Sequence, residues 1–331
     1  MGIDTGAHGS RLSVSSENVN LRLQVRVKAG DFSEICHFYL HPASGNTNIN
    51  YVEELIVLEK RVRSPIIDGL FYPEDAAGVL AFMRNIGLKQ GRGGQARAII
   101  APHGAWEISG CLAGTAFASA GGRNSWDNPS RLVIMGPVHD NREEGVFLSN
   151  SHFFQTPLGD IPVDQEACDW IESYSPLIRI NDIPHLFEHS IEVLLPFVKY
   201  CFPNSAIVPI LMGGQRKQYI RVLANALRAV FTPEMDNTLL VISFNMEAYG
   251  GEAAVLRMAG EFRRLFREGQ NTELCAALQD GRITGCGGAL VASLLQSGLA
   301  DTACSRLASE SPLVVKGEKG KTVCYGAFSF E

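Results

Sequence analysis

The 331-residue chain has the composition of an ordinary globular protein, with 46% hydrophobic and 19% charged residues. Its net charge of -6 and its lack of a basic stripe argue against nucleic-acid binding. No apolar run reaches the roughly 18 residues that span a bilayer, and the first residues lack the pattern of a signal peptide. We therefore expect a cytoplasmic protein that binds neither nucleic acid nor membranes.

Residues 1–58 differ in pattern from the rest of the chain, and we expect them to form an N-terminal extension. Residues 1–16 are small and polar, which predicts disorder. Residues 19–27 alternate between apolar and polar side chains, the period of a half-buried strand, and residues 32–40 are their candidate partner in a β-hairpin. Residues 59–331 are then expected to form one α/β domain.

Apolar strands alternate with amphipathic helices from residue 62 onward. We expect strands at 97–101, 131–135, 145–149, 206–212, 238–243 and 322–330, and helices from 73 to about 86 and at 108–119, 164–173, 188–201, 216–231, 252–268, 271–279 and 288–297. Pro196 should kink or end its helix. This alternation predicts an α/β fold in which helices cover both faces of a mostly parallel or mixed central sheet.

Two of the predicted strands break at a proline and are followed closely by a histidine. The run 99–101 leads through Pro102 to His103, and the run 132–135 leads through a Gly-Pro pair to His139. Binding sites in such sheets form beyond the carboxyl ends of the strands, so we expect both imidazoles, at adjacent strand ends, in one site. Neutral imidazole is a ligand for Fe, Cu and Zn. The alternative for each histidine is an ordinary turn residue.

Cys286 is the best candidate among the cysteines for a further ligand. It lies between glycines in TGCGGAL, just before a predicted helix, and a helix N-terminus lowers the pKa of a thiol. The alternative is a small residue that packs at the start of the helix. His189, which follows Glu188, is either a structural residue of its helix or a ligand or proton shuttle.

Two glycine-rich stretches differ from nucleotide-binding loops in spacing or position. KGEKGKT (316–322) is two residues short of a P-loop and precedes a strand instead of a helix. GRGGQA (91–96) comes before a strand, whereas a dinucleotide-binding motif follows one. We therefore expect no nucleotide cofactor.

Residues 61 to 330 resemble the Memo family, whose prokaryotic members are often called AmmeMemoRadiSam system protein B. The resemblance rests on VRSPIIDGLFYP (62–73), IIAPHGAWEISG (99–110), VIMGPVHD (133–140), TPLGDIPVD (156–164), EHSIEVLLPF (188–197), VPILMGG (208–214), GCGGAL (285–290) and VCYGAFSF (323–330). It implies a fold similar to that of the class III extradiol dioxygenases, with a metal cleft at the strand ends.

The resemblance also implies a ligand set and a partner. The two histidines and one cysteine of the Memo family map onto His103, His139 and Cys286, with Fe(II) or copper as the metal. We expect their ligand atoms to lie within about 5 Å of one another, since bonds to a metal are about 2.0 to 2.3 Å long. The family label suggests a radical-SAM or modification enzyme as a partner, by association only.

The segment 239–251, LLVISFNMEAYGG, departs from the family pattern S-S-D-F-x-H-Y-G. Asn245 replaces the aspartate, which removes a general base, and Ala248 replaces the histidine. Glu247 is one residue from the lost histidine, an offset that should point it elsewhere.

These replacements favour a protein that binds a metal, a small molecule or a peptide in its cleft, or a degenerate paralogue that interacts with a partner protein, over an efficient catalyst. The alternative is a non-heme iron-dependent or copper-dependent oxidoreductase of the dioxygenase type. In that case His189 and Asn245 are the candidate catalytic residues. The sequence leaves open whether the protein is an enzyme.

Overall fold

The computed structural model describes residues 60–89, 96–120, 129–140, 142–300 and 320–330, together with strands between residues 3 and 57 and between 305 and 316. The chain divides into two units, Met1–Lys60 and Arg61–Glu331. Of the two glycine-rich stretches that were rejected as nucleotide-binding loops, residues 91–95 and 317–319 lie outside the described residues.

The first unit contains a five-stranded antiparallel sheet in which consecutive strands are neighbours. Its strands are β1 (Ile3–Gly6), β2 (Gly9–Ser16), β3 (Val19–Lys28), β4 (Ile35–Pro42) and β5 (Ile56–Val57). β3 pairs with β4, as the alternation predicts, with Val25 opposite Phe38. β1 and β2 occupy residues for which we expected disorder. In β2, Leu12 and Val14 alternate with polar residues, which is the period of a strand.

The second unit is built on an eight-stranded mixed sheet, which confirms the expected α/β fold class. The strand order is β12 (Ile178–Ile180), β9 (Gly145–Leu148), β13 (Ala206–Gly213), β8 (Arg131–Pro137), β14 (Thr238–Ser243), β7 (Ala98–Ala101), β20 (Phe328–Phe330) and β17 (Ser305–Leu307). The four central strands from β13 to β7 run parallel. They are buried along almost their whole length, as continuous apolar runs predict.

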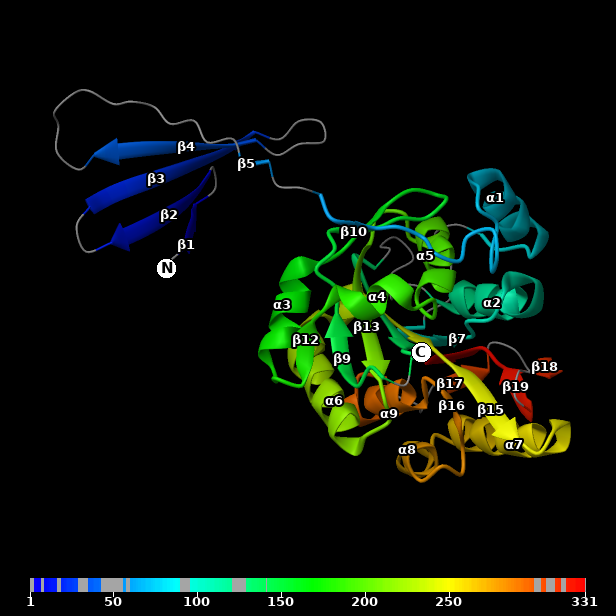
Figure 1. Ribbon diagram of the computed structural model, residues 1–331. Coiled ribbons are helices and arrows are strands. Elements are labelled where there is room, and N and C mark those ends of the chain that lie inside the picture. Colours follow the sequence, from blue (N-terminus) through cyan, green and yellow to red (C-terminus); the bar gives the residue numbers. More distant parts are fainter. Residues whose placement is uncertain are drawn as a thin grey trace. The chain divides into compact units, whose positions relative to one another are not determined.

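Helices cover both faces of this sheet (Figure 1). α3 (Gln165–Ser173), α6 (Lys217–Phe231) and α9 (Gly288–Ser297) pack on one face, with α8 (Asn271–Gln279) against α9. α2 (Cys111–Ser119) and α5 (Leu195–Cys201) cover the other, and α1 (Ala76–Asn85) lies beside them in Figure 1. The short helices are α4 (Asp182–Phe187), η1 (Trp106–Gly110), η2 (Glu192–Leu194) and η3 (Thr232–Asn237). Among the described residues, no helix combines the length and apolar character needed to cross a membrane.

Two smaller sheets complete the second unit. One contains β11 (Ile161–Pro162), β10 (Phe153–Phe154) and β6 (Val62–Arg63). The other is antiparallel and contains β16 (Gly285–Cys286), β15 (Asn245–Tyr249), β19 (Lys321–Tyr325) and β18 (Leu313–Lys316). β15 packs against α7 (Glu252–Arg267). This four-stranded sheet begins where β14 ends, so it lies at the edge where the two histidines are expected.

The predicted helix over 188–201 was wrong at its start. Residues 188–191 are not helical; η2 begins at Glu192, and α5 follows with Pro196 in its first turn. Proline suits the first turn because the N–H it lacks has no partner there, so Pro196 helps begin the helix instead of ending it. The Glu188 carboxylate accepts the backbone N–H groups of His189 and Ser190, which holds this stretch in a turn.

The predicted strand over 322–330 is two strands in different sheets. β19 belongs to the four-stranded sheet and β20 to the eight-stranded sheet. The break falls at Gly326, where an added Cβ would lie 2.8 Å from the Phe328 ring. A glycine therefore allows the chain to turn closely against its own aromatic side chain and to change sheets.

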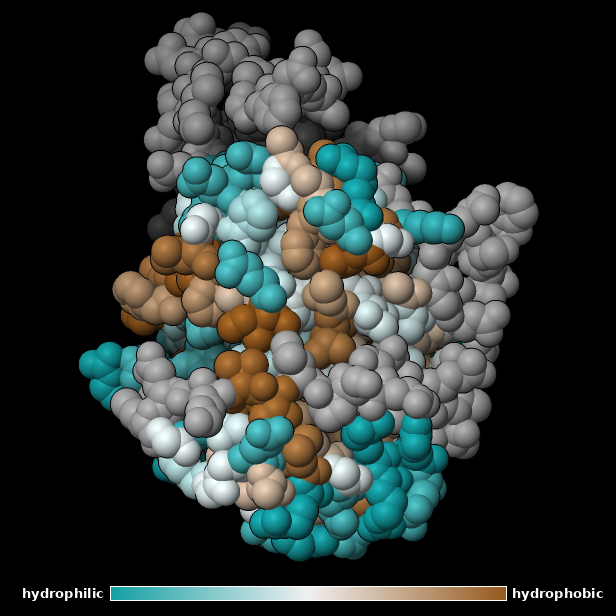
Figure 2. Space-filling view, turned by 90° about the vertical axis from the view of Figure 1, so that its right-hand side faces the viewer, coloured by the Kyte–Doolittle hydropathy of each residue, from teal (hydrophilic) through white to brown (hydrophobic). Residues whose placement is uncertain are grey.

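The surface of the protein is not uniformly polar. Figure 2 shows the face that lies to the right in Figure 1, where hydrophobic residues gather in the middle and continue toward the lower part, and hydrophilic residues cover the bottom. Among the described residues, Leu70 and Phe187 are the most exposed large apolar side chains, at 77% and 79%. They lie next in sequence to Phe71 and Glu188, two residues that contact the site described below.

Candidate metal centre

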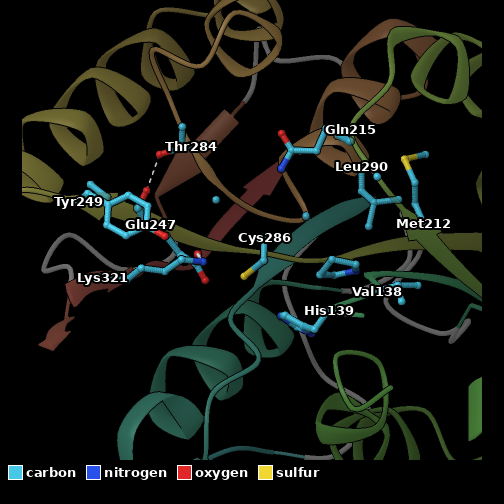
Figure 3. Close-up of a pocket in the computed structure, with 16 residues that line it drawn as sticks. Val138, His139, Met212, Gln215, Glu247, Tyr249, Thr284, Cys286, Leu290 and Lys321 are labelled. Atoms are coloured by element: carbon cyan, nitrogen blue, oxygen red, sulfur yellow. Dashed lines mark hydrogen bonds and ion pairs between the residues drawn. The ribbon is translucent and has the colours of Figure 1, made fainter. Parts of the chain in front are cut away.

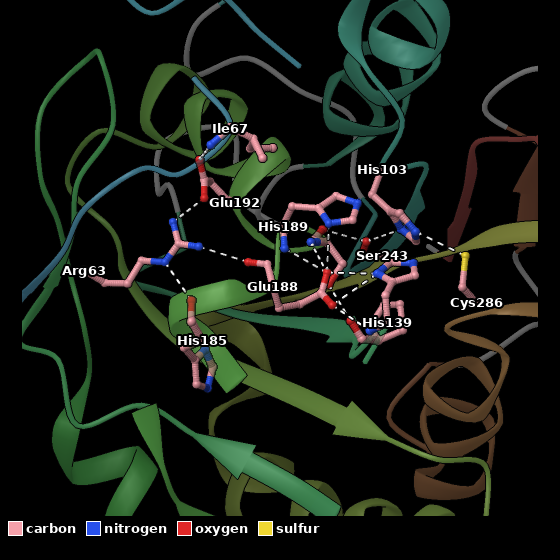
Figure 4. A network of polar contacts seen from close by, with 12 residues as sticks. Arg63, Ile67, His103, His139, His185, Glu188, His189, Glu192, Ser243 and Cys286 are labelled. Carbon is pink, nitrogen blue, oxygen red and sulfur yellow. Dashed lines mark hydrogen bonds and ion pairs between the residues drawn. The ribbon is translucent and has the colours of Figure 1, made fainter. Parts of the chain in front are cut away.

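The three predicted metal ligands meet in space. One ligand atom from each of His103, His139 and Cys286 lies within 4.8 Å of the others, which confirms the expected proximity. The Cys286 Sγ lies 3.2 Å from His103 Nε2, and the two imidazole centroids are 5.3 Å apart. Figure 4 shows both rings and the thiol gathered at one place.

We expected the two histidines to follow adjacent strands, but they do not. His103 follows β7 and His139 follows β8, and β14 lies between these strands. The intervening strand ends at Ser243, whose side chain is fully buried. The sequence pattern therefore placed the histidines at the correct edge, but the strand between them supplies a polar group that the pattern did not indicate.

Cys286 reaches the histidines through the four-stranded sheet. β16 pairs with β15, which places Cys286 opposite Asn245. The glycines on either side make this approach possible. A Cβ on Gly285 would lie 2.2 Å from the Asn245 carbonyl oxygen, and one on Gly287 would lie 2.3 Å from that of Ser243. Gly287 also has a φ of 93°, which side chains rarely adopt.

Hydrogen bonds set the tautomer of His103. The Ser243 hydroxyl donates its only proton to the Ser190 carbonyl oxygen at 2.8 Å, and it lies 2.6 Å from His103 Nδ1. Ser243 must therefore accept a proton from Nδ1. His103 is thus protonated at Nδ1, and the Nε2 lone pair that faces Cys286 is available to a metal.

The Glu188 carboxylate sets the tautomer of His139. This carboxylate lies 3.0 Å from His139 Nδ1 and accepts the backbone N–H groups of His139, His189 and Ser190. Because an ionised carboxylate can only accept, the proton of the neutral His139 ring lies on Nδ1, and Nε2 has the lone pair. A carboxylate behind a ligating histidine is a common second shell of metal sites.

The electrostatics of the two histidines differ. Burial, with the charges of His139 and His189, keeps the pKa of His103 well below 6.5, so its ring is neutral. Burial also acts to lower the pKa of His139, but the hydrogen bond and charge of Glu188 outweigh it and raise that pKa. Burial opposes ionisation of Glu188, yet its contacts with His139 lower its pKa to about 2.

The expectation of a lowered thiol pKa at Cys286 was wrong. Burial raises the pKa of this thiol, and the nearby carboxylate of Glu247 raises it further. Cys286 precedes the first residue of α9 by two positions, yet desolvation dominates over the helix dipole. Without a cation, the thiol is protonated.

His189 lies beside the centre. Its ring stacks on that of His139 with centroids 4.8 Å apart, and its centroid is 6.2 Å from that of His103. Its Nδ1 is 3.3 Å from the Glu188 carboxylate, and the edge of Phe71 packs against it. Burial lowers the pKa of His189. It is therefore close enough to contact a ligand at the centre, as the sequence suggested.

A buried ion pair that we did not predict supports Glu188 from behind (Figure 4). Arg63 pairs with Glu192 and donates hydrogen bonds to the backbone oxygens of Glu188 and His185, each at 2.9 Å. Arg63 is 3% exposed and Glu192 1%. Glu192 also accepts hydrogen bonds from Tyr72 and from two backbone N–H groups of the segment after β6. The sequence feature that could have indicated this pair is EHSIE (188–192). Its first glutamate, Glu188, contacts His139, and its second, Glu192, contacts Arg63.

Asn245 and Glu247 lie close to the candidate ligands. The Asn245 side-chain oxygen accepts the backbone N–H of His103 at 3.2 Å, so it holds the loop that carries this histidine. We expected Glu247 to point away from the site, and this prediction was wrong. Because β15 continues through these residues as a strand, Glu247 lies two positions from Asn245 and faces the same pocket as Cys286.

A pocket of about 520 Å³ opens onto Cys286 and His139 (Figure 3). Its volume is in the range of small-molecule sites, about 300 to 1,000 Å³. Glu247 and Lys321 form an ion pair of 2.8 Å in its wall, and Ala248 also lines it. The candidate metal centre is therefore accessible to a small ligand.

Comparisons with known proteins show the family to which the chain belongs. The family model described as Memo-like protein matches residues 63–328. MEMO1 family proteins of Aeropyrum pernix and Methanothermobacter thermautotrophicus are 28% and 26% identical, each over 81% of this chain and 99% and 100% of their own. The MEMO1 family protein of Thermotoga neapolitana is 29% identical over 59% of this chain and 74% of its own.

A solved structure, that of an uncharacterized protein from Escherichia coli K12, covers 72% of this chain and all of its own at 12% identity. Its TM-score of 0.43 is too low to support an argument about fold or function. The family match covers four fifths of the chain and includes all three candidate ligands and the two residues that set their tautomers. The chain belongs to the Memo-like protein family.

Proposed function

We propose that the protein binds one metal ion through His103, His139 and Cys286 and uses the adjoining pocket to bind a ligand. The observation that carries the proposal is the hydrogen bonding behind the two imidazoles. Ser243 and Glu188 each hold an Nδ1 proton, which leaves both Nε2 atoms as lone-pair donors beside a thiol. A structural cluster of histidines has no need for matched tautomers.

The donor set fits Fe(II) or copper. Imidazole nitrogen suits both metals, and a thiolate favours the softer ones. Two atoms bound to one ion at about 2.0 to 2.3 Å lie roughly 3 to 4.5 Å apart. The Cys286 Sγ and His103 Nε2 atoms are 3.2 Å apart, and all three ligand atoms lie within 4.8 Å of one another. A bound ion would lower the pKa of the Cys286 thiol that burial raises. It would supply a Lewis acid at the floor of the pocket.

Binding is favoured over catalysis by the two replaced positions. Asn245 cannot accept a proton as a base, and Ala248 has no polar atom. The ligand is then a small molecule or a peptide held in the cleft. A radical-SAM or modification enzyme as a partner remains a proposal from the family label. A cytoplasmic location is part of the proposal, since a ligating thiol needs a reducing compartment.

Elemental analysis of protein purified without oxygen tests the metal centre. We expect one equivalent of iron or copper in the wild type and its loss in His103→Ala and Cys286→Ser. Cys111→Ser is the matched control because this cysteine is exposed on α2. A wild type that holds no metal and takes up none from Fe(II) or copper salts would overturn the proposal.

A second function, oxidation of a bound substrate, is favoured by the pocket that opens on the ligands. Its test restores the missing groups with Asn245→Asp and Ala248→His together. If their loss is what disables catalysis, oxygen uptake with Fe(II) and catechol-like substrates should rise by a factor of about 10² to 10⁴, the usual contribution of acid–base groups. No gain in a variant that still binds metal would count against this second function.

A further inference from the structure

The pocket beside the candidate metal centre has two chemically different ends (Figure 3). On one side of Cys286 lie the polar residues Tyr249, Glu247, Thr284 and Lys321; on the other lie Gln215 and the apolar residues Val138, Met212 and Leu290. From this division we infer that the pocket binds a small carboxylic acid with an apolar body. The carboxylate pairs with Lys321 and the body lies along the apolar wall, across the metal centre.

Lys321 is the group that selects the carboxylate. An ammonium group has three protons. In the part of the chain that the structure describes, that of Lys321 donates a hydrogen bond to the Glu247 carboxylate at 2.8 Å and lies 6.0 Å from the centroid of the Tyr249 ring. The Lys321 side chain is 40% exposed, so its remaining protons are accessible from the pocket. A hydrogen bond between an ammonium and a carboxylate is about twice as strong as one between neutral groups.

The contact between Glu247 and Lys321 means that a cationic ligand should bind more weakly than a carboxylate. The Glu247 side chain is less exposed than that of Lys321, at 22%, and the lysine already balances its charge. A ligand ammonium would have to displace Lys321, whereas a ligand carboxylate can join it.

The apolar wall opposite Lys321 determines how the affinity should depend on the length of the ligand's hydrocarbon chain. Val138, Met212 and Leu290 offer hydrocarbon surface and no charge. Each methylene moved from water to such a surface contributes about 0.8 kcal/mol, or roughly a fourfold gain in affinity. The affinity for straight-chain acids should therefore rise with chain length until the pocket is full.

This inference names the ligand class of the proposed metal site and so rests on the proposed function. It can be tested separately, because Lys321 and the apolar wall do not include the candidate ligands. The full chain, with and without bound Fe(II), is titrated calorimetrically with butanoate, hexanoate and octanoate. Hexanol and hexylamine carry the same chain as hexanoate with a neutral or cationic head, so they isolate the contribution of the carboxylate.

We expect hexanoate to bind at least tenfold more tightly than hexanol or hexylamine, with roughly fourfold gains per methylene. Lys321→Met should lower the affinity for hexanoate about tenfold or more and leave that for hexanol unchanged. Lys321→Arg should retain binding, since it keeps the charge. Lys89→Met, a lysine exposed after α1, is the control and should match the wild type.

Three results would overturn the inference: hexanoate affinity unchanged in Lys321→Met, hexylamine as the tightest ligand, or no acid bound by protein that holds Fe(II). A protein that takes up neither Fe(II) nor copper but binds hexanoate through Lys321 would overturn the metal centre and support the carboxylate site. The two proposals therefore fail in distinguishable ways.

Discussion

The two sides of the site differ in how they are held. The histidine side projects from the parallel core of the large sheet and is supported by buried groups, Ser243, Glu188 and the Arg63–Glu192 pair. The cysteine side belongs to the small antiparallel sheet, where Glu247 and Lys321 form a partly exposed pair. The first side therefore sets the geometry of the centre, whereas residues of the second side can be replaced, and the ligand that they bind changed, at little cost to the stability of the fold.

The largest effect should come from Arg63→Ala. It leaves the Glu192 carboxylate buried without its cation, a change that typically costs about 3 to 5 kcal/mol of unfolding free energy. Lys321→Met breaks the exposed pair on the other side and should cost at most about 1 kcal/mol. Denaturant unfolding of both variants measures the difference. Equal losses would contradict the comparison.

The pH dependence of stability should also arise on the histidine side. Burial lowers the pKa of His185 to about 4, whereas its value in the unfolded chain is near 6.5. Between these pH values the unfolded state binds a proton that the folded state does not, so stability falls as the pH drops from 6.5 to 4. The loss should approach roughly 3 kcal/mol, at 1.36 kcal/mol per pKa unit.

Replacing this histidine provides the control. The His185 Nε2 lies 3.2 Å from the Phe147 carbonyl oxygen, so it donates a hydrogen bond there. A glutamine side chain can donate the same bond without titrating. Thermal unfolding of His185→Gln between pH 4 and 7 should show a flatter profile than the wild type. An unchanged slope would assign the acid sensitivity to other groups.

A smaller effect is expected from Ser243→Ala, which removes the acceptor of the His103 Nδ1 proton. Loss of such an outer partner typically lowers metal affinity 10- to 100-fold, while the rest of the site remains. Competition with a chelator measures the change. Ser293→Ala is the matched control, because this buried serine bonds only to its own helix α9. Equal affinity in both variants would mean that Ser243 does not set the tautomer.

Much of the fold could be predicted because burial leaves a local period in the sequence. The runs before His103 and His139 are apolar throughout, which is typical of strands buried on both faces, and the proline after each run ends it. The helix over 188–201 was wrong at its start because the turn there depends on hydrogen bonds to Glu188. No periodicity encodes such bonds.

The sequence by itself determined the α/β class, the strand ends that carry His103 and His139, and the glycines that flank Cys286. These are local properties, since each depends on residues within a few positions. Only the tertiary structure decided that β14 separates the two histidine strands and that β15 brings Glu247 to Cys286. It also decided that burial raises the pKa of the Cys286 thiol. These depend on pairing and desolvation between segments far apart in the chain, which short-range patterns do not record.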